Sequence, residues 1–275
     1  MRAQWAIRGG TLPIGGRTLL MGILNVTPDS FSDGGRFLAP EAALAHGETL
    51  AAEGADILDV GGESTRPGSA QVDAEEELAR VLPIVQALAG RLAVPVSIDT
   101  YKAGVAAAAV EAGARIVNDV WGFQRDPDIA RIAADSGAGV VLMHNRLKFD
   151  TAVDMLAEVK DFLARSLDVA LGAGVREEAI VLDPGIGFGK TTEQDLMLIG
   201  RIGDIRAMGF PVLLGASRKK FIGRLTDQPD PMRRLGGTLG AHLMGVAAGA
   251  DIVRAHDVAA HRDALTVLDA IRAAA

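Results

Sequence analysis

The sequence predicts an α/β fold, a (β/α)8 or TIM barrel, preceded by a short N-terminal hairpin. Three observations predict it. The chain has 275 residues, close to the roughly 250 typical of such a barrel. Short β-branched segments alternate along the chain with longer segments of helical periodicity. Eight of these pairs follow one another without a Pro- or Ser-rich linker, so we expect residues 1–275 to form one domain.

Each expected strand is a short apolar run that ends in Gly or a polar residue, and each expected helix is an Ala- and Leu-rich segment. The expected strands are Leu19–Leu24, Ile57–Val60, Val94–Ile98, Arg115–Val117, Val140–Met143, Ile180–Leu182, Val212–Leu214 and Ile252–Val253. The expected helices are Pro40–Glu53, Ala74–Ala89, Lys102–Glu111, Pro127–Asp135, Ala152–Ala170, Gln194–Met208, Met232–Ala248 and Val258–Ala274.

The segment Gln4–Ile14 has the pattern of a hairpin that turns at Gly9 and Gly10 and covers the bottom of the barrel. The same alternation of strands and helices is compatible with an open, doubly wound sheet. Eight uninterrupted units favour the closed barrel.

Charge and cysteine content exclude several classes of function. The chain carries 28 Lys and Arg against 35 Asp and Glu, a net charge of -7, which disfavours nucleic acid or an anionic membrane as the main partner. It has no Cys, and therefore no disulfide, thiolate metal site or cysteine nucleophile. No segment offers the ~20 apolar residues of a membrane span, and the N-terminus lacks the apolar core of a signal peptide. We expect a cytoplasmic protein.

A polar residue stands at or just after the end of each expected strand. A barrel gathers the carboxyl ends of its strands on one face, which holds the active site, so these side chains should line one mouth. A single Asp or Asn in such a place could instead cap the next helix, but a run of eight points to a site. These residues are Asn25, Asp59, Asp99, Asn118, His144, Asp183, Ser217 and Arg254.

The two carboxylates of Asp99 and Asp183 and the amide of Asn118 are costly in an apolar mouth unless they meet a ligand or each other. A carboxylate can accept two parallel hydrogen bonds from an N–C–N edge, such as that of an aminopyrimidinone, and an amide can recognise a further donor and acceptor. A carboxylate pair also suits acid–base work or a metal. The residues alone leave these uses open.

Three segments have the composition of an anion site. The loop Thr27–Gly35 is dense in Asp, Ser and Gly, and Gly61–Gly68 combines glycines with Thr65 and Arg66. Ser217–Lys220 is a basic cluster after the seventh strand, where barrels often bind phosphate. Each of the three could equally be an ordinary solvated turn.

The glycine-rich segment Asp183–Thr191 is not a P-loop, because Pro184 stands where that motif needs its first glycine. Its glycines are better suited to a close approach of the backbone to a flat ligand. Arg254 and His256, two residues apart after the eighth strand, should project to the same side as a two-pronged anion site. Taken alone, His256 could be a structural histidine.

Seven segments together resemble the dihydropteroate synthases of bacterial folate synthesis, over nearly the whole chain. They are Met21–Gly35, Gly61–Gly68, Ser97–Thr100, Val117–Asp119, Asp183–Lys190, Ser217–Lys219 and Arg254–Asp257. The resemblance implies a (β/α)8 barrel that condenses 6-hydroxymethyl-7,8-dihydropterin diphosphate with p-aminobenzoate, giving dihydropteroate and pyrophosphate. It also implies a homodimer through the C-terminal helices.

The same resemblance implies roles for individual residues. Those that would bind the pterin are Asp99, Asn118, Asp183 and Lys219, packed against Ile23, Val120, Met143, Phe188 and Gly215. Those that would bind the diphosphate are Thr65, Arg254 and His256, with Asn25 as the ligand of Mg2+. Those in the two loops that would close over the substrates are Phe31, Asp33, Arg66 and Pro67. The expected catalytic residues are Asp99, Lys219, Asp33 and Arg66.

The sequence departs from the family pattern in two places. Met143–Lys148 lacks the Gly-x-Pro turn common after the fifth strand, and Lys220 replaces a Ser found in some members at the aminobenzoate edge. Two other interpretations stay open: a pterin-binding methyltransferase that serves a corrinoid protein, and a paralogue that binds pterin without turnover. The Thr27–Gly35 loop and the predicted diphosphate site count against both.

Overall fold

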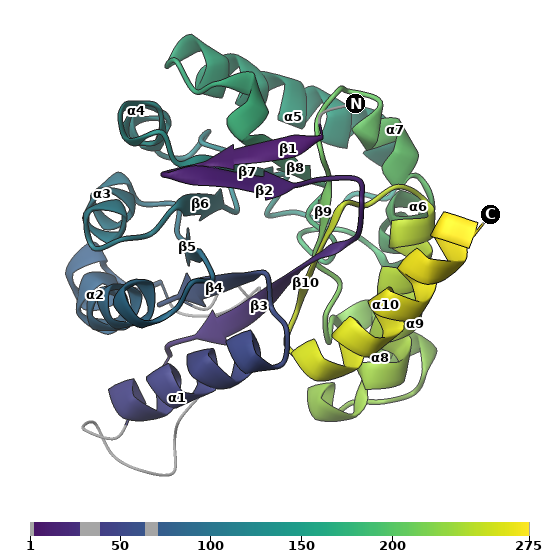
Figure 1. Cartoon of the computed structure of the whole chain (residues 1–275). Coiled ribbons are helices and arrows are strands. Elements are labelled where there is room, and N and C mark those ends of the chain that lie inside the picture. The colour runs from purple at the N-terminus through teal and green to yellow at the C-terminus, as the bar shows by residue number, and fades with distance from the viewer. Residues whose placement is uncertain (1–2, 28–38, 64–70, 275) are drawn as a thin grey trace.

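The computed structural model describes residues 3–27, 39–63 and 71–274. Within these residues, eight parallel strands form a barrel (Figure 1). They are β3 (Leu19–Asn25), β4 (Ile57–Gly61), β5 (Val96–Asp99), β6 (Ile116–Asp119), β7 (Gly139–Met143), β8 (Ile180–Asp183), β9 (Leu213–Leu214) and β10 (Ile252–Ala255). The strand order is β8-β7-β6-β5-β4-β3-β10-β9, and a parallel bridge between Leu182 and Val212 joins the two ends. The predicted barrel is confirmed, and the open sheet is not formed.

The helices surround the barrel (Figure 1). They are α1 (Ala39–Ala52), α2 (Ala74–Arg91), α3 (Ala103–Glu111), α4 (Asp128–Ser136), α5 (Met155–Gly172), α6 (Thr192–Gly200), α7 (Ile202–Arg206), α8 (Lys220–Leu225), α9 (Leu235–Ala247) and α10 (Val258–Ala274). Local sequence sets their ends. Asp73 caps α2 by accepting a hydrogen bond from the backbone of Glu76, and Thr191 and Gln194 form a capping box at α6.

Two helical predictions need correction. The single helix expected over Gln194–Met208 is two helices, α6 and α7, because the chain leaves helical geometry at Arg201 (φ -110°, ψ 20°), directly after Gly200. The short helix α8 was not predicted and lies between β9 and α9. None of the described helices is long and apolar enough to cross a membrane.

The N-terminal hairpin consists of β1 (Gln4–Ile7) and β2 (Gly10–Pro13), and it lies across the near end of the barrel in Figure 1. Ile7 pairs with Gly10, so the turn is Arg8–Gly9, one residue before the predicted position. Gly9 takes a positive φ (+73°), which glycine adopts without steric cost.

The hairpin closes the amino-terminal end of the barrel, as predicted. Trp5 is fully buried and donates its indole N–H to the carbonyl oxygen of Ala179 over 2.8 Å. Trp5, Ile7 and Ile14 pack in one apolar cluster with residues from seven of the strands. These are Leu19, Met21, Ile57, Ile116, Val141, Val181, Leu213 and Ile252. The opposite end of the barrel is left for polar side chains.

Candidate active site

A pocket lies at the carboxyl ends of the strands, where the polar residues were expected to converge. It encloses about 50 Å³. It is lined by Asp99, Asn118, Val120, Met143, Asp183, Gly185, Ile186, Phe188, Gly215, Lys219 and Arg254. The structure therefore brings eight of the nine residues predicted to bind and pack a pterin into one place; the ninth, Ile23, is buried in β3 and does not line the pocket.

The floor of the pocket is a cluster of buried charges around Arg254. Its Nε donates to Asp59 Oδ2 over 2.6 Å, and its Nη2 donates to Asp99 Oδ2 over 2.8 Å. Asp59 Oδ2 also accepts a hydrogen bond from Asn118 Nδ2 over 2.9 Å. Burial raises the pKa of Asp99 to about 7, although the neighbouring guanidinium opposes that rise. One oxygen of this carboxyl, Oδ1, is buried without a hydrogen bond among the described residues.

Asp183 stands at the end of β8 with one oxygen already engaged. Its Oδ1 accepts a hydrogen bond from the backbone N–H of Gly185 over 2.7 Å, which fixes the carboxyl and leaves Oδ2 for a ligand. Burial raises the pKa of Asp183 to about 6, because loss of water disfavours the charged form.

Lys219 follows β9 and is the cation nearest to the ring of Phe188 among the described residues. Its Nζ lies 4.2 Å from the ring centroid. Burial lowers the pKa of Lys219 to about 8, with the charge of Arg254 acting in the same direction. A flat ligand in the pocket would meet an aromatic ring and two cations.

His256 does not line this pocket. Its Nδ1 lies 2.9 Å from Ser217 Oγ, and its backbone N–H donates to the same oxygen over 3.2 Å. Arg254 is turned towards Asp59 and Asp99 instead. The predicted two-pronged arrangement of Arg254 and His256, and their binding of diphosphate, stay predictions.

Asn25, the predicted magnesium ligand, ends β3 opposite Gly61. Gly61 has no side chain, and a Cβ built on it would lie 3.8 Å from Asn25 Oδ1 and 3.6 Å from Asp99 Oδ2. Both oxygens therefore lie close to the backbone of Gly61. The described residues hold no group of three or more His, Cys, Asp or Glu side chains arranged for a metal. One amide oxygen fits an Mg2+ ion that takes its other ligands from phosphate and water.

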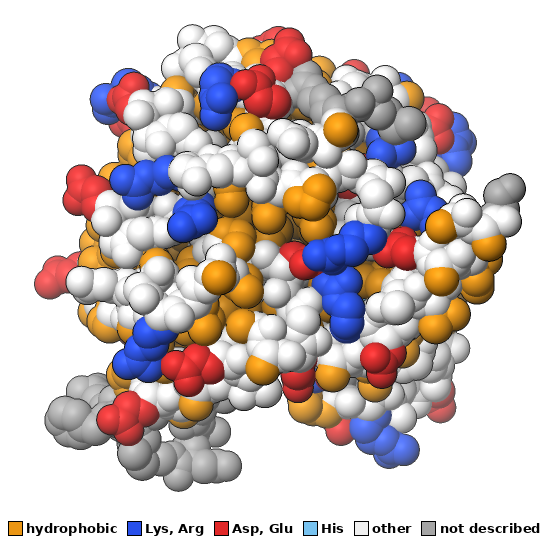
Figure 2. All heavy atoms as spheres, in the orientation of Figure 1, with side chains coloured by type: hydrophobic (Ala, Val, Ile, Leu, Met, Phe, Trp, Pro, Cys, Tyr) orange, Lys and Arg blue, Asp and Glu red, His pale blue; other side chains and the backbone are white. Residues whose placement is uncertain are grey.

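A second, larger cavity of about 440 Å³ lies at the other end of the barrel. Its charged side chains are all paired: Arg206 holds Asp251 with two hydrogen bonds, Arg272 lies 3.7 Å from Asp269, and Arg17 pairs with Asp56 beside the cavity. Figure 2 shows this face, with basic and acidic side chains adjacent near the C-terminus. Because these charges satisfy each other, the smaller pocket is the better candidate for chemistry.

Comparison with known proteins decides the family. The model of the family described as pterin binding enzyme matches residues 21–256. The dihydropteroate synthase of Bacillus subtilis is 48% identical over 242 residues, which cover 88% of this chain and 84% of that protein. The chain belongs to the dihydropteroate synthase family of pterin-binding enzymes. Members of this family are transferases, so the chain is an enzyme of that class.

Solved structures of dihydropteroate synthases share the whole fold. The Xanthomonas albilineans dihydropteroate synthase with 4-aminobenzoic acid has a TM-score of 0.94 at 45% identity, covering 99% of both chains. The same enzyme in complex with 7,8-dihydropteroate has a TM-score of 0.88 at 44% identity, covering 96% of this chain and 97% of that chain. The corrinoid-dependent methyltransferase is therefore not the interpretation that the comparisons support.

Five residues that the dihydropteroate synthase pattern places in the substrate loops lie outside the described residues. They are Phe31, Asp33, Thr65, Arg66 and Pro67. Their roles stay predictions.

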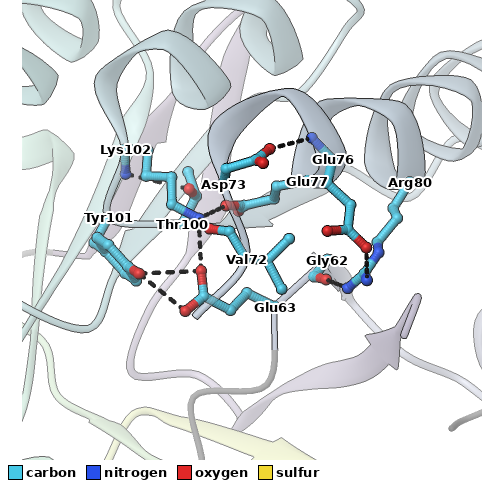
Figure 3. A network of polar contacts seen from close by, with 10 residues as sticks. All are labelled: Gly62, Glu63, Val72, Asp73, Glu76, Glu77, Arg80, Thr100, Tyr101 and Lys102. Atoms are coloured by element: carbon cyan, nitrogen blue, oxygen red, sulfur yellow. Dashed lines mark hydrogen bonds and ion pairs between the residues drawn. The ribbon is translucent and has the colours of Figure 1, made fainter. Parts of the chain in front are cut away.

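The described ends of the second loop are held by an ion cluster (Figure 3). Lys102 Nζ donates to Glu63 Oε2 over 2.5 Å, to the carbonyl oxygen of Val72 over 2.7 Å, and to the carboxylate of Glu77. Tyr101 donates its hydroxyl to Glu63 over 2.9 Å. Glu63 and Val72 lie on either side of residues 64–70, so one ammonium fixes both ends of that segment beside β5.

Sequence reasoning missed two parts of this dihydropteroate synthase site. Asp59 was expected at the mouth of the barrel, but its contacts were not predicted. Its Oδ2 accepts hydrogen bonds from both Asn118 and Arg254, so it connects the predicted pterin-binding amide to the guanidinium. Lys190 was treated as the end of a failed P-loop motif. It is buried beneath the pocket, with its ammonium 2.8 Å from Nδ1 of His144. The sequence signal that could have indicated this role is a lysine placed directly after a run of glycines.

Proposed function

We propose that this chain joins 6-hydroxymethyl-7,8-dihydropterin diphosphate to p-aminobenzoate, giving dihydropteroate and pyrophosphate for folate biosynthesis. One observation supports this most strongly. Asp99, Asn118 and Asp183 stand together in a pocket whose other polar lining is cationic. Donors of a heterocycle can be recognised on one side of such a pocket and a leaving anion on the other. The Xanthomonas albilineans relative was solved with 4-aminobenzoic acid and with 7,8-dihydropteroate.

Recognition of the pterin is assigned to the two carboxylates and the amide. Asp183 Oδ2 accepts from the N–C–N edge of the aminopyrimidinone, while its Oδ1 is held by Gly185. Asn118 has its amide N–H on Asp59, so its carbonyl oxygen is directed as an acceptor. Phe188 and Met143 cover the faces of the ring.

The reaction needs no nucleophilic side chain. The bond between the pterin methylene carbon and the diphosphate oxygen breaks, the amine nitrogen of p-aminobenzoate bonds to that carbon, and the amine loses a proton. Positive charge develops on the pterin as diphosphate leaves. The carboxylate of Asp99 stabilises that charge, while Lys219 and Arg254 favour the departing anion.

Diphosphate and aminobenzoate recognition extends the site beyond the pocket. We assign the diphosphate to Arg254, His256 and Thr65. We assign aminobenzoate, and exclusion of water over it, to the loops that carry Phe31, Asp33, Arg66 and Pro67. Asn25 would hold Mg2+ together with the diphosphate oxygens. When bound, that ion supplies neutralising charge to the leaving group.

We further propose a cytoplasmic homodimer formed through the C-terminal helices. Met244 on α9 and Val267 and Ile271 on α10 are large apolar side chains that are more than half exposed. A second copy of the chain would cover this face by two-fold symmetry. Val267→Asp should shift the mass measured by light scattering from two chains to one; an unchanged mass would place the interface elsewhere.

A product assay tests the function. Purified protein is incubated with the pterin diphosphate, p-aminobenzoate and Mg2+, and dihydropteroate and pyrophosphate are measured. The proposal expects both products in equal amounts and neither when one substrate is omitted. Pterin binding without product would identify a non-catalytic paralogue instead.

A further inference from the structure

Lys190 follows the run of glycines after β8 but does not line the pocket. Its side chain is 3% exposed. A lysine in a P-loop reaches outward to phosphate; this one is turned back beneath its own loop. Burying an ammonium costs free energy unless each N–H donates to an acceptor. The acceptors of Lys190 therefore identify the part of the structure that it holds in place.

Burial lowers the pKa of Lys190 to about 7, so the ammonium is the form present below neutral pH. In that form all three donors are used, and each acceptor is uncharged. Lys190 Nζ donates to the carbonyl oxygen of Gly185 over 2.7 Å and to that of Phe188 over 3.2 Å. Its third contact is His144 Nδ1, at 2.8 Å. Burial keeps the pKa of His144 well below its ordinary value, so the ring is neutral and Nδ1 accepts. One cation thus ties both ends of a four-residue turn to the segment after β7.

The turn packs tightly against the backbone of the segment that follows β7. Gly185 and Gly189 have φ values of +66° and +62°, and a Cβ at either position would overlap the backbone carbonyl of His144 or Arg146. Phe188 N–H closes the turn on Gly185 over 3.1 Å, and Asp195 accepts from Gly187 over 2.7 Å. The carbonyls of Gly185 and Phe188 therefore point inward to Lys190, and the N–H groups of Gly185 and Gly187 point to carboxylates.

Two residues that line the pocket depend on this turn. The N–H of Gly185 holds Asp183 Oδ1, and the ring of Phe188 lies against Lys219 Nζ. Lys190 itself lies behind both. A shift of the Gly185 or Phe188 carbonyl would move the acceptor and the aromatic wall together.

We propose that Lys190 is a positioning residue of the pterin pocket, whose ammonium sets the Gly185–Phe188 turn and through it the places of Asp183 and Phe188. This inference rests on the proposed function, because the ligand that reports it is a pterin. It assigns Lys190 no contact with diphosphate or aminobenzoate.

Lys190→Met tests the proposal, since it keeps most of the side-chain volume and removes the ammonium. The affinity for 6-hydroxymethylpterin, measured by calorimetry, should fall roughly tenfold to a hundredfold, the scale of a displaced binding group. In steady state the KM for the pterin diphosphate should rise while the KM for p-aminobenzoate changes little. Lys160→Met on the outer helix α5 is the matched control and should bind like wild type.

The absence of cysteine from the chain allows a rescue experiment. Lys190→Cys, alkylated in denaturant with 2-bromoethylamine and refolded, carries an ammonium at this position alone: sulfur displaces bromide and forms the new S–C bond. It should regain pterin affinity, whereas the same protein alkylated with bromopropane should not. Wild type taken through the same cycle controls for refolding.

A folded Lys190→Met protein with wild-type pterin affinity would overturn the proposal. Should that variant not fold, Lys190→Gln decides, because its shorter amide cannot reach both carbonyls and His144 at once. A loss of pterin affinity by threefold or more supports the proposal, and unchanged affinity contradicts it. Failure of wild type itself to bind pterin would instead contradict the proposed function.

Discussion

Arg254 and Asp59 form a 2.6 Å ion pair inside the barrel, between strands β10 and β4, which lie on either side of β3. The same guanidinium reaches Asp99. An arginine predicted from sequence to bind diphosphate is thus also the counter-ion of the pterin floor. Ligand recognition and the stability of the barrel share one side chain.

Arg254→Met should therefore lower the stability of the chain and its pterin affinity as well as its affinity for phosphate. Removing one partner of a buried ion pair costs about 3 kcal/mol, and Asp59 and Asp99 would both lose their cation. We expect the melting temperature to fall by roughly 5–10 °C. We also expect weaker binding of free 6-hydroxymethylpterin, as well as of its diphosphate, by calorimetry.

Arg206→Met is the matched control for that variant, because Arg206 pairs with the buried Asp251 at the opposite end of the barrel. It should lower the melting temperature and leave pterin affinity unchanged. If Arg254→Met weakened only the diphosphate ligand, Arg254 would not act on the pterin floor.

The pH dependence of pterin binding should have two limbs. The pKa values of Asp99 and Asp183 are raised to about 7 and about 6, so both carboxyls gain protons as the pH falls towards 5 and lose acceptor strength. Affinity should rise with pH across this range. Above pH 7 it should fall again, because burial lowers the pKa of Lys190 to about 7 and that of Lys219 to about 8, and both ammonium charges are lost.

Stability of the ligand-free chain should respond to these carboxyls in the opposite sense. Their pKa values in the folded chain lie above the ordinary value of an aspartate, 3.8, so the folded chain binds more protons between pH 4 and 7. Their contribution to the free energy of unfolding is therefore lost as pH rises through that window. Calorimetric titrations and thermal melts from pH 5 to 9 check both trends; affinity independent of pH would contradict the assignment.

Lys102→Met should destabilise the chain through the cluster in Figure 3. It leaves Glu77, which is almost fully buried, and Glu63 without their shared cation. A cost of about 2–4 kcal/mol is expected for breaking such a pair. Arg91→Met, which breaks an exposed pair with Glu48, should cost no more than about 1 kcal/mol. If urea unfolding gave the same loss of unfolding free energy for both variants, the Lys102 cluster would stabilise the chain no more than an exposed ion pair does.

The order of substrate binding is a further prediction. The loops Thr27–Gly35 and Thr65–Gly68 have little apolar surface to hold them closed, and ordering a backbone residue costs about 1–2 kcal/mol. p-Aminobenzoate alone could not supply that for two loops. Calorimetry should detect its binding only with Mg2+, pyrophosphate and a pterin present. Equal affinity for the free enzyme would indicate a preformed aminobenzoate pocket.

Strand ends could be predicted because alternation of apolar runs and helices determines where each β-strand stops. Asp99, Asn118 and Asp183 follow from that rule, and the structure places all three in one pocket. The hairpin could be predicted from its glycines, although its turn lies one residue earlier.

Contacts across the barrel could not be predicted in this way. Nothing local in the sequence indicates that Arg254 turns to Asp59, 195 positions away, or that Lys190 turns under its own loop. Such choices depend on which buried charges find partners. The break at Arg201 was missed because the apolar periodicity continues through it.

The most direct test of the account is calorimetry of 6-hydroxymethylpterin with wild type and with Asp183→Asn. The amide presents an N–H donor where the ligand needs an acceptor, and an unpaired buried group costs roughly 1–3 kcal/mol. The Asp183→Asn protein should melt near the wild-type temperature and bind pterin at least tenfold more weakly, with no dihydropteroate formed. A folded Asp183→Asn protein with wild-type affinity would contradict the placement of the pterin in this pocket.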